Sequence, residues 1–329
     1  MPQAPSRMRP PQLRRFPITG WIGLSIIVLC EVMLFADVAL SHRGAVETES
    51  QVTAILQNRP VTLSAKIARL VAINMTAIVW IGYLLLLEGT LTKQQGRSPV
   101  RARRHHFALL CLASVFIWCV FDAINFRRGM RAWEYIGIPH RFEDRILPYL
   151  FAFGAIVPSM LMSGQVLLNA RWFDRLRGRP WKLPSAGWWL IVLIGAIMCA
   201  WPLLDARPIT NLTLWTSLVF LLDPINLKLG RPSLLRDWQN GWYGRTAALF
   251  AGGLMCGLLW EFWNYWALAK WVYHLPFLGP LEHVRYFQMP VIGLLGFIPF
   301  GAECWVMWQT MRIPLDGLAE PLPDDRSLL

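Results

Sequence analysis

Acidic and amide side chains lie inside apolar stretches of this sequence, where they are costly and therefore informative. The pattern acid-x-x-Asn occurs three times, as Asp122 with Asn125, Asp223 with Asn226, and Glu261 with Asn264. A spacing of three places both side chains on one face of a helix, so each pair offers an acceptor and an amide donor to the same place. A charge at the centre of a membrane helix costs about 2.5–3.5 kcal/mol, so such residues usually face a cavity or a partner.

The densest group surrounds Glu261. Trp260, Glu261 and Asn264 share a helix face, whereas Trp263 and Trp266 point further round. A carboxylate walled by indole rings is desolvated, which favours proton exchange near neutral pH. We therefore predict that Glu261 donates or accepts a proton and that Asn264 orients the reacting group. The tryptophans are predicted to line an apolar or cation-stabilising pocket.

Two alternatives stand beside this interpretation. An aromatic belt at the membrane interface accounts well for Trp271 and Tyr273 but poorly for Glu261. The pairs at the predicted helix ends, above all Asp223 with Asn226, are better explained as hydrogen bonds between helices.

A second carboxylate, Glu303, follows a segment rich in glycine and proline, which predicts a kinked helix beside a cavity. Glu303 and Glu261 could then share a proton, giving one acid and one base; pairing of Glu303 with a basic residue is equally open.

His140 and His274 each follow a Trp-x-Tyr segment and are candidates for acid–base chemistry or ligand binding. The predicted catalytic residues are Glu261, Glu303 and His274. The predicted substrate-binding residues are Asn264, Trp260, Trp263, Trp266, Asp122, Asn125 and His140.

These residues recur in two halves of the chain. The stretch from Trp118 to about Pro158 resembles that from Trp260 to about Pro299, and the matched positions keep their order with small gaps. A second pair of matches lies upstream, where Pro17, Gly20, Trp21 and Asp37 recur as Pro184, Gly187, Trp188 and Asp205. The pattern predicts two copies of one four-helix unit.

The composition places these units in a membrane. The chain has 329 residues, of which 55% are hydrophobic and only 16% are charged, with 18 tryptophans. About 20 apolar residues span a bilayer core. Eight segments fit, near 18–40, 68–88, 107–126, 147–169, 187–204, 209–226, 246–269 and 290–311. The sixth is interrupted by Asp223 and Pro224. The predicted fold is an all-α integral membrane protein with about eight transmembrane helices in two parallel repeats.

The basic residues predict orientation. On the eight-helix topology, 20 of the 32 Lys and Arg residues fall on the side that holds both termini, which predicts N-in and C-in. The predicted organisation is a basic tail 1–17, a first repeat 18–170 with an outer-loop insertion at about 41–67, a linker 171–186, a second repeat 187–312 and a disordered tail 313–329. The net charge of +12 fits anionic inner-leaflet lipids at the basic loops and does not indicate nucleic acid.

Several classes are disfavoured. All six cysteines fall within predicted spans and none forms a CxxC pair, so disulfides and zinc sites are not indicated. No GxSxG, HExxH, nucleotide loop, di-iron histidine boxes or paired DxxD motif occurs. The sequence identifies no cofactor.

The leading hypothesis is an enzyme of a bacterial inner membrane that acts on a lipid or isoprenoid-like substrate by carboxylate acid–base chemistry. The alternatives are a proton-coupled transporter or flippase of an amphiphilic solute, and an assembly subunit that binds another membrane protein or a pigment.

Overall fold

The computed structural model describes residues 15–315 and 327–329. Most of the predicted basic tail 1–17 and most of the predicted disordered tail therefore lie outside the described residues. Within them, seven helical segments are long and apolar enough to cross a membrane: Ile18–Leu40, Leu63–Gln95, Arg104–Asn125, Phe142–Asn169, Ala186–Leu204, Gly244–Tyr265 and Val291–Met311. The chain is a multi-pass integral membrane protein.

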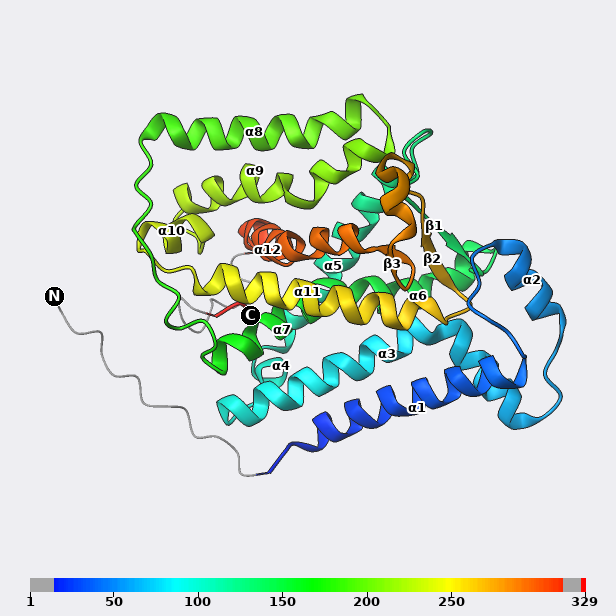
Figure 1. Ribbon diagram of the computed structural model, residues 1–329. Coiled ribbons are helices and arrows are strands. Elements are labelled where there is room, and N and C mark those ends of the chain that lie inside the picture. The colour runs from blue at the N-terminus through cyan, green and yellow to red at the C-terminus, as the bar shows by residue number, and fades with distance from the viewer. Residues whose placement is uncertain (1–14, 316–326) are drawn as a thin grey trace.

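The elements follow one another in two long groups (Figure 1). The first group comprises α1 (Ile18–Leu40), α2 (Glu49–Gln57), α3 (Leu63–Gln95), α4 (Pro99–Ala102), α5 (Arg104–Asn125), β1 (Trp133–Ile136), α6 (Phe142–Gly154) and α7 (Ile156–Asn169). The second comprises α8 (Ser185–Leu204), η1 (Pro208–Thr213), α9 (Leu214–Lys228), α10 (Leu234–Gln239), α11 (Gly244–Tyr265), β2 (Lys270–Tyr273), η2 (Pro276–His283), β3 (Arg285–Tyr286), β4 (Met289–Pro290), η3 (Val291–Gly293), α12 (Leu294–Met311) and η4 (Ile313–Leu315).

The predicted sixth span, 209–226, begins in the 3-10 helix η1 and continues as α9, which has only 15 residues. Pro224 lies inside this helix. Its neighbour Asp223 accepts hydrogen bonds from the backbone N–H groups of Leu234 and Leu235, both at 2.9 Å, and so caps α10. The acid at this position has the structural role that the sequence suggested.

Local sequence signals account for several helix ends. The Thr48 side chain accepts from the Gln51 backbone and the Gln51 side chain returns to the Thr48 backbone, a capping box that starts α2 in the predicted outer-loop insertion. At the other end of α3, Gly96 adopts φ 75°, a left-handed conformation that favours glycine and terminates the helix.

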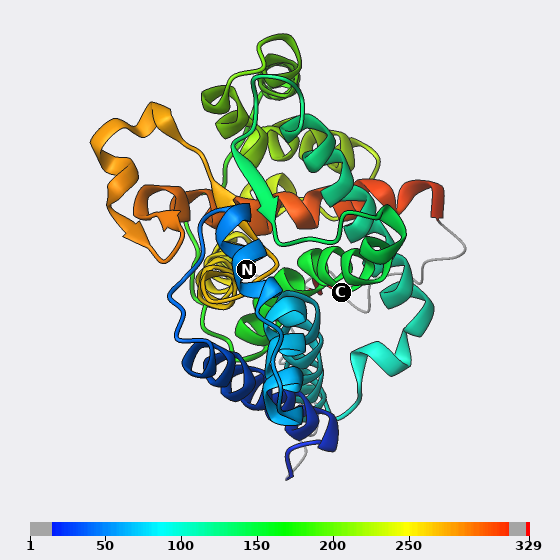
Figure 2. The same ribbon diagram turned by 90° about the vertical axis from the view of Figure 1, so that its right-hand side faces the viewer.

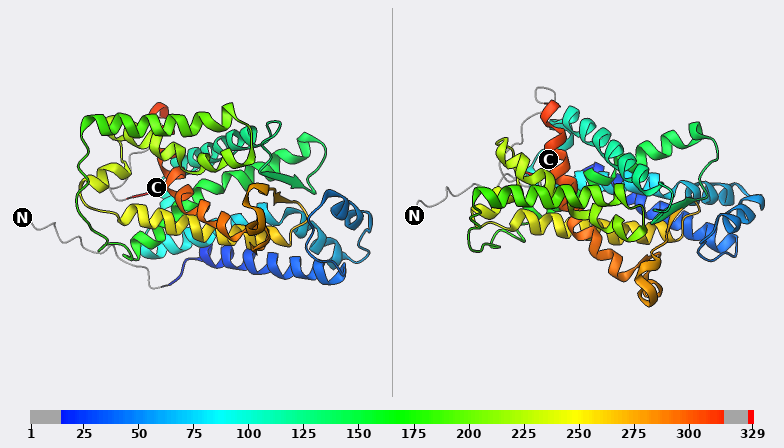
Figure 3. Two further views of the ribbon diagram at one scale, coloured as in Figure 1. Left: turned by 45° about the horizontal axis from the view of Figure 1, so that its top comes forward. Right: turned by 90° about the horizontal axis from the view of Figure 1, so that it is seen from above.

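The helices pack as a bundle in which α1 lies along α3 and α8 lies along α9, with α11 and α12 between these pairs (Figures 1 and 3). Close approach of α11 and α12 depends on a small residue. A Cβ atom at Gly301 would lie 2.2 Å from the carbonyl oxygen of Leu249, so the two backbones touch at this point.

A two-stranded ribbon joins the two groups of elements at one end of the bundle. β1 pairs with β2 in antiparallel register, with Trp133 opposite Tyr273 and Tyr135 opposite Trp271. The adjoining segment 276–293 projects to the side of the bundle (Figures 2 and 3). Because both strands carry the Trp-x-Tyr pattern, the ribbon sets each tryptophan beside the tyrosine of the other strand.

The last three residues of the chain contact the opposite end of the bundle. Leu328 is buried, and its N–H donates to the Gln165 side chain at 2.7 Å. This ordered contact differs from the disordered tail predicted for 313–329, as does the 3-10 turn η4. Residues 316–326, in the middle of that tail, lie outside the described part of the chain.

Candidate functional site

Two asparagines fix the strands of the ribbon to the ends of α5 and α11. Asn125 donates to the Trp133 carbonyl oxygen at 2.7 Å and accepts from the Trp133 N–H at 3.2 Å. Asn264 makes the same two contacts with Trp271, at 2.9 and 3.0 Å. In both clamps the side-chain oxygen and nitrogen each have a partner on the strand backbone. Each asparagine therefore holds its strand in place, and neither is among the residues that line the cavities described below, so substrate binding by Asn125 and Asn264 stays a prediction.

Each clamp brings a tyrosine of the ribbon to the acid that precedes the asparagine. The Tyr135 hydroxyl donates to Asp122, with O–O distances of 3.0 and 3.1 Å. The Tyr273 hydroxyl donates to Oε1 of Glu261 at 2.8 Å. The structure thus contains two carboxyl–tyrosine pairs, one in each group of elements, with matching supports.

Indole N–H groups complete each pair. The Tyr135 hydroxyl accepts from Nε1 of Trp118 at 2.9 Å, and Asp122 also accepts from Nε1 of Trp133 at 3.1 Å. The Tyr273 hydroxyl accepts from Nε1 of Trp271 at 2.8 Å. Asp122 is therefore bonded by two aromatic donors. Glu261 differs, because its Oε2 atom is fully buried and has no hydrogen-bond partner among the described residues.

The tyrosines remain neutral. Burial, reinforced by the neighbouring carboxyl group, raises the pKa of Tyr273 well above 10, and the same causes raise the pKa of Tyr135. At neutral pH each phenol is a hydrogen-bond donor that connects its carboxyl group to the space in front of the ring.

The space in front of Tyr273 is a cavity of about 110 Å³, named here the aromatic cavity. Its aromatic walls are Trp118, Trp133, Trp215, Trp260, Trp271, Tyr273 and Phe297. Its rim includes Leu212 and Ile292, which are 50% and 45% exposed. No charged side chain is among the residues that line it. The cavity is therefore an apolar slot with an apolar mouth.

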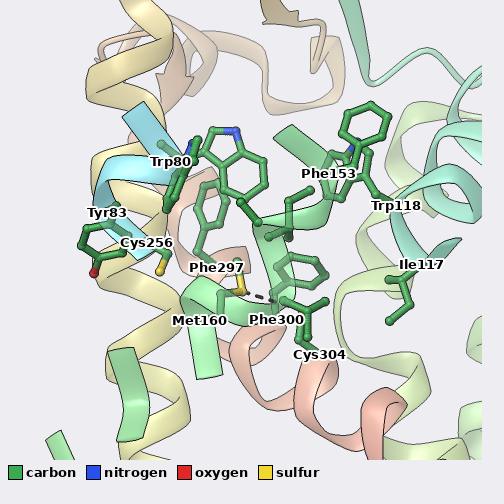
Figure 4. Close-up of a cluster of buried hydrophobic side chains, with 14 of the residues drawn as sticks. Trp80, Tyr83, Ile117, Trp118, Phe153, Met160, Cys256, Phe297, Phe300 and Cys304 are labelled. Atoms are coloured by element: carbon green, nitrogen blue, oxygen red, sulfur yellow. Dashed lines mark hydrogen bonds between the residues drawn. The ribbon is translucent and has the colours of Figure 1, made fainter. Parts of the chain in front are cut away.

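The core behind the cavity is also aromatic. Trp118 of α5 lies 5.5 Å from Trp260 of α11 between ring centroids, and 6.3 Å from Phe300 of α12. Figure 4 shows Trp118, Phe297 and Phe300 gathered with Trp80 of α3 in this core. Such packing holds the cavity walls in fixed positions.

A second cavity of about 80 Å³ lies on the Tyr135 side and is lined by residues that include Trp80, Tyr135 and Phe153. It shares Trp118, Trp260 and Trp271 with the aromatic cavity. Each carboxyl–tyrosine pair is thus associated with its own aromatic-walled space.

Several predicted site residues lie elsewhere. Trp263 donates from Nε1 to Glu31 at 3.1 Å and packs against Trp80, while Trp266 packs against Phe35. Neither lines the aromatic cavity, because Trp263 stands on another face of α11 and Trp266 follows the last residue of that helix. Of the three tryptophans predicted to form the pocket, Trp260 alone reaches it.

The two histidines lie at the surface. His274 comes directly after Tyr273, the last residue of β2, and its N–H donates to the Ala132 carbonyl oxygen. Tyr273 lines the aromatic cavity and His274 does not, as expected where successive side chains alternate between faces. Its Nε2 lies 2.9 Å from Glu134, and its side chain is 48% exposed. His140 is also exposed. The prediction that His274 is catalytic and His140 binds substrate does not fit these positions.

Glu303 does not meet Glu261. Its Oε1 accepts from the Leu218 N–H of α9 at 2.9 Å. Gly301, two residues before Glu303, lies beside Gly253 where α11 and α12 cross. Glu261 is eight residues beyond Gly253 in α11. At about 1.5 Å per residue, this places Glu261 more than 10 Å further along the bundle. The predicted shared proton is therefore ruled out, and Glu303 joins α12 to α9.

Asn211, a residue of η1, is a site residue that the sequence does not mark. Asn211 lines the aromatic cavity, is 2% exposed, and neither its Oδ1 nor its Nδ2 has a hydrogen-bond partner among the described residues. It is separate from the acid-x-x-Asn pattern, and a lone asparagine three residues after a proline in a helix connection predicts only a turn.

Lys270 of β2 is a buried cation close to this site. Its Nζ donates to the carbonyl oxygens of Val46 and Tyr265, at 3.0 and 2.7 Å. Burial lowers its pKa from 10.5 to about 8; Glu261 and Glu47 oppose this shift and Arg43 adds to it. Lys270 lines the second cavity.

The lowered pKa predicts a stability that rises with pH. Between about pH 8 and pH 10.5 the unfolded chain binds the Lys270 proton more tightly than the folded protein, so the cost of burying the charge is relieved as the pH rises. A shift of this size corresponds to roughly 3 kcal/mol. We expect the melting temperature of wild type minus that of Lys270→Met to increase from pH 7.5 to pH 10, measured in detergent. A constant difference would contradict the lowered pKa.

The chain matches no protein-family model, no curated protein and no solved structure. Within residues 15–315 and 327–329, no group of three or more His, Cys, Asp and Glu side chains could hold a metal ion. Apart from the indole N–H groups of its tryptophans, the polar side-chain groups that line the aromatic cavity are the Asn211 amide and the Tyr273 hydroxyl, with the Glu261 carboxyl group behind the tyrosine.

Proposed function

We propose that the protein is a membrane enzyme that binds a lipid or isoprenoid-like substrate in the aromatic cavity and acts on it by acid–base chemistry. The observation that carries this proposal is the Glu261–Tyr273 pair. Glu261 is fully buried with one free oxygen, and the tyrosine that bonds its other oxygen lines the cavity. A proton can therefore pass between Glu261 and a bound molecule through the Tyr273 hydroxyl.

The aromatic walls of the cavity would stabilise the positively charged species formed in the proposed reaction. Protonation of a carbon–carbon double bond, or removal of a proton beside a charged carbon, passes through a species with positive character. The faces of indole rings stabilise a nearby cation, and Trp215, Trp260 and Trp271 surround the space in front of Tyr273. The apolar lining also excludes water, which would otherwise capture such a species.

The proposal includes the two-repeat organisation. The Asn125 and Asn264 clamps, the two carboxyl–tyrosine pairs and the antiparallel pairing of two Trp-x-Tyr strands support two copies of one four-helix unit, with α9 as the equivalent of the long helix α3. In this proposal the protein lies in a bacterial inner membrane with both termini inside and eight helices in all, and its basic loops contact anionic lipids.

The second candidate is a transporter or flippase of an amphiphilic solute. The observation in its favour is the presence of two aromatic-walled cavities, one at each carboxyl–tyrosine pair, with Trp118 and Trp260 in the walls of both. A solute could pass from one to the other only if these two rings, 5.5 Å apart, separate.

Deuterium exchange tests the enzyme proposal directly. The purified protein, with its co-purified lipids, is incubated in D₂O, and the extracted lipids are examined by mass spectrometry. We expect one lipid to gain deuterium at carbon in the wild type and to gain it at least 10-fold more slowly in Tyr273→Phe, which lacks the hydroxyl that links Glu261 to the cavity. A bound lipid that gains no deuterium at carbon would favour the transporter.

A further inference from the structure

The unpartnered amide of Asn211 indicates what the aromatic cavity binds. Asn211 belongs to the η1 turn and is one of the residues that line the cavity, and its backbone carbonyl caps the turn by accepting from the Leu214 N–H. A buried amide with neither a donor nor an acceptor partner pays the full cost of leaving water. A ligand that offers one acceptor and one donor would remove that cost.

The charge of the cavity restricts the ligand further. Arg and Lys are the side chains that most often bind phosphate and carboxylate groups in proteins, and the residues that line this cavity include neither. An ammonium group would be attracted to the indole faces, but it has no lone pair with which to accept from Nδ2 of Asn211 and would leave that donor unpaired. The head group is therefore uncharged.

A hydroxyl group fits the polar atoms that remain. It can accept from Nδ2 of Asn211 and donate to Oδ1 of Asn211 or to the Tyr273 oxygen. That oxygen already accepts from Trp271 and donates to Glu261, which leaves it capacity for one more hydrogen bond as an acceptor. A hydrocarbon would leave Asn211 unpaired.

The size and mouth of the cavity fit the head of a longer chain. A dry cavity of about 150 Å³ holds benzene, so about 110 Å³ admits a head group and its first few carbons. The exposed side chains of Leu212 and Ile292 at the rim would lead the remaining chain out along an apolar surface.

We infer that the aromatic cavity binds an uncharged lipid alcohol of the isoprenoid type and that Asn211 recognises its hydroxyl group. This inference rests on the proposed function for the site, and it adds the class of the head group and the residue that selects it.

The test compares three C15 probes that share one chain: farnesol, farnesyl monophosphate and the hydrocarbon farnesene. Binding to the wild-type protein in detergent is followed by tryptophan fluorescence, since five indoles line the cavity. We expect farnesol to bind at least 10-fold more tightly than either of the others, because only the alcohol satisfies Asn211 without a charge.

Two variants test whether Asn211 causes the preference for farnesol. Asn211→Leu is expected to lower farnesol affinity to that of farnesene. Asn74→Leu is the matched control, because Asn74 lines the second cavity and its loss should leave farnesol affinity unchanged. Equal affinity of the wild type for alcohol and hydrocarbon, preference for the phosphate, or no saturable binding of any probe would each overturn the inference, even if the Asn211 variant does not fold.

The failure of this inference is distinguishable from the failure of the proposed function. Glu261→Gln should retain farnesol binding, because the glutamine still accepts from Tyr273. Loss of alcohol selectivity together with deuterium exchange into the co-purified lipid would overturn the role of Asn211 and leave the acid–base proposal standing. Alcohol selectivity without deuterium exchange would overturn the acid–base proposal and leave the role of Asn211 standing.

Discussion

Glu261→Gln is expected to slow deuterium incorporation into the bound lipid by about 10²–10⁴-fold, the usual contribution of a general acid or base. Glutamine keeps the oxygen that accepts from Tyr273, so the ribbon and the cavity wall should stay in place. It cannot hold an exchangeable carboxyl proton. The measurement is the time course of mass gain of the lipid extracted from protein in D₂O.

The matched control for this variant is Glu31→Gln. Glu31 is also a glutamate of a spanning helix, and its Oε1 accepts from Nε1 of Trp263 on a face of α11 that does not line the aromatic cavity. We expect wild-type exchange in this variant. Wild-type exchange in a folded Glu261→Gln protein would remove Glu261 from the proposed chemistry.

Asp37→Asn is expected to have the largest effect on stability. Asp37 is 2% exposed, and its two oxygens accept from Nε of Arg43 at 2.9 Å and from Nε of Arg69 at 2.6 Å. Removal of one partner from a buried ion pair typically costs about 3–5 kcal/mol, because the remaining charge is left without compensation. We expect the melting temperature in detergent to fall by roughly 6–10 °C.

The control comes from the equivalent position of the predicted repeat. Asp205 pairs with Arg207, but both side chains are substantially exposed, at 33% and 65%. Such pairs contribute little, so Asp205→Asn should melt close to wild type. Equal melting temperatures for Asp37→Asn and wild type would show that the two arginines find other partners.

The contrast between these two positions shows how far the sequence could predict the structure. Asp37 and Asp205 occupy matched places in the sequence, yet one lies in a buried cluster and the other at the surface. The difference comes from the insertion at about 41–67, because Arg43 and the Ile55 carbonyl that anchors Arg69 both belong to it. Periodicity and hydropathy predict that each aspartate lies near the end of a helix, but they do not predict which loop residues will contact it.

The site was predictable to a similar degree. The apolar setting of Glu261 and its face shared with Trp260 follow from helical spacing. The pairing of β1 with β2 does not, because strands of four residues from distant parts of the chain leave no local signal of their register. Without that register, Tyr273 is predicted to be an interfacial aromatic residue and His274 is predicted to lie equally close to the site. Asn264 is likewise predicted to be free to bind substrate.

The ribbon also has a consequence for biogenesis. β1 is synthesised well before β2, and at about 5–20 residues per second β2 follows on the order of 10 s later. Throughout this interval the edge of β1 lacks its ladder partner, although its asparagine clamp can already form. The amino-terminal half therefore enters the membrane with this end unfinished, and insertion of α11 is the step that allows both halves to close.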